Sequence, residues 1–126
     1  MVSWSSKKQQ IIALLTVEAK YVAQVHAAKE GLWLHMLLGE LQSEPECQIT
    51  INSDNKGAIT LSKDNKYCSW TKHIDICYYF IHEVVEDEKL SVQYVPIDEN
   101  LANIFTKALA KPKFHCFMEQ LGLCMI

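Results

Sequence analysis

The sequence predicts an α/β domain in which helices alternate with strands and the later strands run parallel. Two observations lead to this prediction. Apolar residues recur every three or four positions in some segments, which is typical of helices, and every second position in others, which is typical of strands. The chain has 126 residues, 49% of them hydrophobic, which is enough for one domain with a buried core. We therefore expect residues 1–126 to form a single domain.

Local patterns predict each element in turn. A short strand is expected over 2–7. A long helix is expected over 17–41, where Val17, Tyr21 and Val25 recur at helical spacing. The remaining elements, in chain order, are a strand over 47–53, helices over 55–62 and 74–88, a strand over 90–95, and helices over 98–108 and 113–121.

Composition narrows the class of protein. The net charge of −3 and the pI near 5.9 do not indicate a nucleic-acid binder, and all twelve basic residues are lysines. The five cysteines are widely spaced and form no CxxC pair, which indicates reduced thiols in an intracellular protein rather than a zinc site. No stretch approaches the ~20 apolar residues of a membrane span, and the N-terminus does not resemble a signal peptide. We expect an intracellular protein without a membrane partner.

Asp54 directly follows the apolar run at 49–53 and precedes an expected helix. One interpretation is that Asp54 caps this helix, since short polar side chains accept hydrogen bonds from the free amides of a first turn. The other is that Asp54 holds a metal ion, because the carboxyl ends of strands often carry the chemistry in open α/β sheets. Glu18 is equally ambiguous, since a carboxylate in a first helical turn also complements the helix dipole.

A family resemblance rests on several local strings that follow one another along the chain. They are VSWSSKKQ (2–9), EAKYVA (18–23), AAKEGLWLHMLLGEL (27–41), SDNKGAI (53–59), TKHIDI (71–76), YVPIDENLANIFTKAL (94–109) and PKFHCFMEQLGL (112–123). In this order and spacing they resemble the ribonuclease H domain of copia-type LTR retrotransposon Pol polyproteins. The resemblance covers essentially the whole chain. It implies the ribonuclease H-like three-layer fold and cleavage of the RNA strand of RNA:DNA hybrids during reverse transcription.

The resemblance also implies a site, a cofactor and partners. Glu18 and Asp54 match catalytic carboxylates that bind two Mg²⁺ ions, for which Mn²⁺ can substitute. Such ions hydrolyse phosphodiesters because one activates water while the other stabilises the leaving oxygen. Lys72 and His73 are the implied substrate contacts, although His73 could equally cap a helix. The implied partners are the RNA:DNA hybrid and the reverse transcriptase and integrase regions of the polyprotein, in a cytoplasmic virus-like particle or the nucleus.

Departures from the family pattern weaken this expected site. Asn103 stands where the family usually has Asp, and a neutral amide is a weaker ligand than a carboxylate for a hard cation. Lys20 replaces the family's usual Glu. A further Asp lies on the family's first strand, upstream of the segment that this chain begins with, so we expect an N-terminally truncated fold that lacks its first two strands. The family's usual arginines, which would contact phosphates, are replaced by His35, Trp70, Cys77 and His82.

These departures lead us to expect a nuclease by descent that is inactive as this chain. Two alternatives are a non-catalytic module that binds nucleic acid or protein, and a structural remnant without function. The missing strands also predict marginal stability or aggregation. They predict either a gap in the sheet or the first segment placed beside the strand at 47–53.

Overall fold

The computed structural model describes residues 3–9, 16–42, 48–63 and 72–124, with side chains except at 42 and 72–78. The chain forms two compact units. One unit is Ile12–Val95, and the other combines the terminal segments Met1–Ile11 and Pro96–Ile126. The expectation of one domain over 1–126 stays a prediction.

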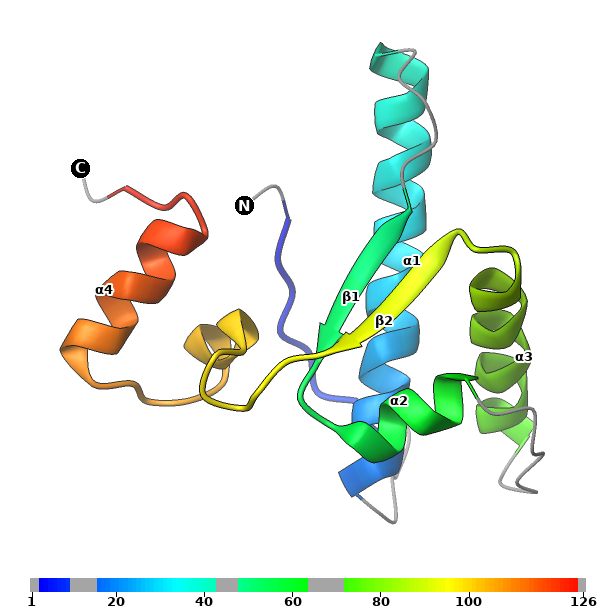
Figure 1. Cartoon of the computed structure of the whole chain (residues 1–126), viewed down its shortest axis with the longest axis horizontal. Coiled ribbons are helices and arrows are strands. Elements are labelled where there is room, and N and C mark those ends of the chain that lie inside the picture. The colour runs from blue at the N-terminus through cyan, green and yellow to red at the C-terminus, as the bar shows by residue number, and fades with distance from the viewer. Residues whose placement is uncertain (1–2, 10–15, 43–47, 64–71, 125–126) are drawn as a thin grey trace. The chain divides into compact units, whose positions relative to one another are not determined.

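The larger unit alternates helices with strands (Figure 1). Its elements are α1 (Thr16–Gln42), β1 (Ile49–Ser53), α2 (Lys56–Lys63), α3 (Lys72–Glu86) and β2 (Leu90–Tyr94). β1 and β2 pair in parallel, from Ile49 opposite Leu90 to Ser53 opposite Tyr94. The chain passes between them through α2 and α3, because parallel strands need a long crossover connection. The predicted α/β class and the parallel pairing of the later strands are confirmed.

The core of the larger unit lies where the helices pack on the two strands. α1 contacts β1, α2 and α3, and both shorter helices contact β2. The buried apolar cluster consists of Tyr21, Val25, Ala28, Ala58, Ile81, Val84, Leu90 and Val92. Gly31 lets α1 approach β1 closely, since a Cβ atom at this position would lie 3.2 Å from Cγ2 of Ile49. The packing therefore places the first turns of α1 against the carboxyl end of β1.

The second half of α1 extends past the strands in Figure 1. Its exposed apolar side chains are Trp33, Met36, Leu37, Leu38 and Leu41. The predicted helix over 17–41 is confirmed. Its apolar spacing predicts one buried face along the whole length. The second half of the helix differs from this expectation, since Met36 is 66% exposed. Periodicity shows which side chains share a face and not whether another element covers it.

No helix in the described part of the chain is long and apolar enough to cross a membrane.

The terminal unit contains η1 (Leu101–Phe105), a short 3-10 helix, and α4 (Lys111–Gln120). The helix predicted over 98–108 is therefore wrong in length and type. Asn100 starts η1 by accepting a hydrogen bond of 3.1 Å from the backbone N–H of Ala102. Within the same unit, the rings of Trp4 and Phe105 stack with centroids 5.6 Å apart.

The strand predicted over 2–7 is also wrong for the residues that the structure describes. Residues 3–9 form neither a helix nor a strand, and those from 3 to 8 are exposed. Among the described residues, the sheet consists of β1 and β2 alone, so this segment does not pair with the strand at 47–53 either. A strand needs a neighbour to satisfy its backbone groups, and alternation in one short segment cannot supply that neighbour.

Candidate functional site

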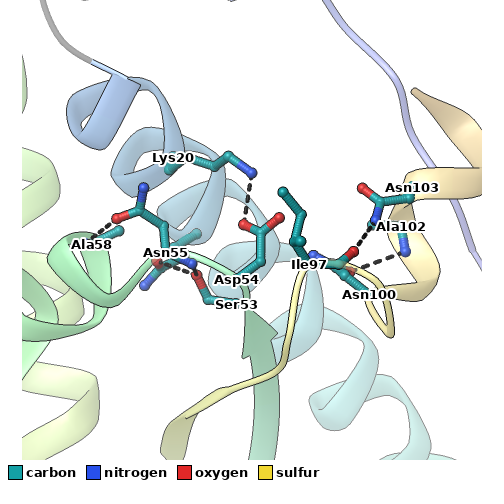
Figure 2. Close-up of polar contacts among 10 residues, drawn as sticks. Lys20, Ser53, Asp54, Asn55, Ala58, Ile97, Asn100, Ala102 and Asn103 are labelled. Atoms are coloured by element: carbon teal, nitrogen blue, oxygen red, sulfur yellow. Dashed lines mark hydrogen bonds and ion pairs between the residues drawn. The ribbon is translucent and has the colours of Figure 1, made fainter. Parts of the chain in front are cut away.

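The candidate site lies where β1 ends and α2 begins (Figure 2). Asn55 Oδ1 accepts a hydrogen bond of 2.9 Å from the backbone N–H of Ala58, the third residue of α2. This is the geometry of an N-cap residue. Asn55, rather than Asp54, therefore occupies the N-cap position of α2.

Asp54 instead pairs with a lysine from α1. Lys20 Nζ donates a hydrogen bond of 2.7 Å to Asp54 Oδ1, as Figure 2 shows. The Asp54 side chain is 4% exposed, whereas that of Lys20 is 40% exposed. A buried carboxylate is costly unless a nearby group balances its charge. The ammonium of Lys20 provides this balance from within the chain.

A buried polar network holds the end of β1 beside α1. Gln24, one helical turn after Lys20, accepts a hydrogen bond of 3.0 Å from Ser53 Oγ through its Oε1. Its Nε2 donates to Ser62 Oγ at 2.9 Å, and Ser62 Oγ donates to the carbonyl of Ala58 at 2.9 Å. Because Gln24 thereby links α1, β1 and α2, it fixes the position from which Asp54 projects.

Glu18 is buried in the first turn of α1 and is 6% exposed. Successive residues of an α-helix are rotated by about 100°, so side chains two residues apart face different directions, whereas those four apart share a face. Lys20 and Gln24 share the side of α1 that meets the end of β1, where they contact Asp54 and Ser53. Lys20 therefore contacts Asp54 from this side of α1.

Sequence reasoning did not identify Lys20 as a site residue. A signal was available, because Lys20 replaces the family's usual Glu and so departs from the pattern at this position. The roles predicted for Glu18 and Asp54 as catalytic residues and metal ligands stay predictions.

Asn103 belongs to the terminal unit and is 6% exposed. Its side-chain Nδ2 donates a hydrogen bond to the carbonyl of Ile97 (Figure 2). Its backbone carbonyl accepts from the N–H groups of Thr106 and Lys107, at 3.2 and 2.9 Å. Asn103 therefore closes the turn that leads into η1, which is a structural reason for an amide at this position.

The predicted substrate contacts lie on α3, which begins at Lys72. The side chains of Lys72 and His73 lie outside the described residues, as do those of Trp70 and Cys77. His82, further along α3, is buried, and its Nε2 donates to the carbonyl of Leu61 at 2.9 Å. This imidazole links α3 to α2, which is a packing role.

The residues present do not fit the expected pair of divalent ions. Mg²⁺ prefers oxygen ligands and Mn²⁺ shares this preference, but Asp54 already has an ammonium at 2.7 Å. Among the described residues, no three His, Cys, Asp or Glu side chains come together as a metal-binding group. Asn103 carries no negative charge, and its amide nitrogen donates to the Ile97 carbonyl.

Comparison with known proteins gives the origin of the chain. The Retrovirus-related Pol polyprotein from transposon TNT 1-94 of Nicotiana tabacum is 39% identical over 122 residues, which are 97% of this chain and 9% of that polyprotein. The chain is homologous to plant retrotransposon Pol polyproteins. Those of transposons RE1 and RE2 from Arabidopsis thaliana are 34% and 33% identical over 125 residues, which are 99% of this chain.

The chain spans less than a tenth of these Pol polyproteins, with 8% and 9% of the two Arabidopsis relatives covered. No family model matches the chain. No solved structure matches it either. The three polyproteins confirm the predicted resemblance to retrotransposon Pol polyproteins, and the assignment to the ribonuclease H domain stays a prediction.

Proposed function

We propose that this chain is the ribonuclease H-like region of a copia-type Pol polyprotein and that, as this chain, it does not cleave RNA:DNA hybrids. The homologous polyproteins support its origin, and the alternation of helices with parallel strands is compatible with the three-layer fold that the sequence strings imply. The proposed partners are other regions of the same polyprotein and the hybrid, inside a virus-like particle or the nucleus.

The observation that carries the loss of activity is the ion pair between Lys20 and Asp54. Hydrolysis by two divalent ions requires carboxylates that bind both ions. A cation that approached Asp54 would be repelled by the ammonium. Two unit charges 4 Å apart repel each other by about 1 kcal/mol in water and about 4 kcal/mol near a protein surface, and a divalent ion doubles this energy. Because about 1.4 kcal/mol is a tenfold change in affinity, Mg²⁺ binding at Asp54 should be weak.

Hybrid binding should also be weak. Proteins bind nucleic-acid backbones chiefly through Lys and Arg, whose contacts release counterions. This chain contains no Arg, and its net charge is −3. Lys72 and His73 are the proposed contacts that remain.

A cleavage assay tests the proposal. A labelled RNA:DNA hybrid is incubated with the chain in Mg²⁺ or Mn²⁺, beside the variants Glu18→Ala and Asp54→Asn. We expect all three proteins to give no more cleavage than buffer. Cleavage that is lost in Asp54→Asn or Glu18→Ala would overturn the proposal. Hybrid binding without cleavage, followed by fluorescence anisotropy, would favour the alternative of a non-catalytic interaction module.

A further inference from the structure

The Lys20–Asp54 pair has an asymmetric exposure. The carboxylate is almost fully buried at 4% exposure, while the lysine reaches it from the solvent side with 40% of its side chain exposed. The anion is thus the fixed inner partner and the cation the accessible outer one. A cation from solution would approach Asp54 from the side that Lys20 now covers.

Asp54 is held in place by contacts that do not involve Lys20. Ser53, the preceding residue, bonds to Gln24 through its side chain and accepts a hydrogen bond of 2.9 Å from the backbone N–H of Val95. Asn55, the following residue, is anchored as the N-cap of α2. Removal of the lysine charge would therefore leave the Asp54 carboxylate buried at the same place without the ammonium that lies 2.7 Å from it.

We propose that Lys20 is a built-in replacement for a metal ion. Its ammonium neutralises Asp54, so the fold is independent of divalent cations, and it prevents them from binding there. The inference rests on the proposed function, because it concerns the same site. It goes further because it names Lys20 as the group that excludes the ion. It is tested by measuring cation binding rather than hybrid cleavage.

The geometry makes the variant Lys20→Glu informative. The side chain at position 20 reaches Asp54, so this variant directs a second carboxylate at the first. Two neighbouring carboxylates, one of them buried, repel each other without a cation, whereas together they offer the oxygen ligands that Mn²⁺ prefers. The variant should therefore depend on a metal ion that the natural chain does not need.

Mn²⁺ binding by calorimetry and thermal unfolding in EDTA or Mn²⁺ test the inference. We expect Lys20→Glu to unfold roughly 4 °C or more below the natural chain in EDTA, to recover in Mn²⁺, and to bind Mn²⁺ at least about tenfold more tightly. Lys8→Glu makes the same change of net charge at an exposed position outside the helices and should behave like the natural chain. The double variant Lys20→Glu/Asp54→Lys has the same net charge as the natural chain, and its carboxylate and ammonium exchange places. Because one carboxylate still faces one ammonium, this variant should gain no Mn²⁺ binding.

Two results would overturn the inference. One is a natural chain that binds Mn²⁺ as tightly as Lys20→Glu does and loses this binding in Asp54→Asn. The other is a folded Lys20→Glu variant that does not respond to Mn²⁺. Should that variant fail to fold, Lys20→Gln removes the charge without adding a second anion. It should unfold at a lower temperature than the natural chain in EDTA and gain stability in Mn²⁺, and no gain would also refute the inference.

The same proteins separate this inference from the proposed function. Hybrid cleavage by the natural chain would contradict the proposed function, whichever protein binds Mn²⁺. A lack of Mn²⁺ binding by Lys20→Glu would contradict the inference and leave the proposed function standing.

Discussion

Asn103 donates a side-chain hydrogen bond to the backbone carbonyl of Ile97, across the turn that precedes η1. The donor is the amide nitrogen, which an aspartate lacks. Sequence comparison with the family pattern marks Asn103 as a degraded metal ligand. In the folded chain its amide has a structural role.

Asn103→Asp should therefore destabilise the protein. A carboxylate oxygen would face the Ile97 carbonyl, and the loss of this partly buried bond should cost about 1–3 kcal/mol. Thermal unfolding in EDTA, followed by circular dichroism, measures the loss. Asn100→Asp is the matched control, because Asn100 uses its side-chain oxygen as an acceptor and Asp retains that oxygen. An Asn103→Asp protein as stable as the natural chain would contradict this prediction.

Asn55→Ala should lower the free energy of unfolding by about 1 kcal/mol, because it removes the N-cap bond to Ala58. Asn55→Asp keeps the acceptor and should cost less. Denaturant unfolding of the two variants measures the difference. Equal losses would mean that the cap bond does not stabilise α2.

Gln24→Met should cost about 2 kcal/mol, because the buried Ser53 hydroxyl loses its acceptor. The double variant Gln24→Met/Ser53→Ala removes both polar partners and should recover part of this loss. A denaturant series on the single and double variants tests this, and simple addition of the two losses would show that the groups are not coupled.

Glu88→Gly should stabilise the protein slightly. Glu88 has a φ of 55°, in the left-handed region. This conformation costs a residue with a Cβ atom roughly 1 kcal/mol, and the greater entropy of glycine in the unfolded chain offsets part of the gain, so we expect about 0.5 kcal/mol. Asp87→Gly, at the preceding turn residue, is the control and should not stabilise. Equal shifts of the unfolding midpoint in both variants would contradict the prediction.

The sequence by itself determined the elements whose signal is local. The long helix α1 and the strands β1 and β2 lie within a few residues of their predicted limits, because apolar spacing is a property of one segment. The sequence strings likewise indicated a retrotransposon Pol origin, which the homologous polyproteins confirm.

Only the tertiary structure decided how the polar residues are used. Lys20 and Asp54 lie 34 positions apart, and no local pattern shows that they form an ion pair. The choice of Asn55 as the cap depends on where β1 ends against α1, a difference of one residue. The direction of the Asn103 amide depends on the fold of the turn around it. The sequence shows which side chains carry a charge or can form hydrogen bonds. A buried polar side chain, however, bonds to the partner that packing brings within about 3 Å.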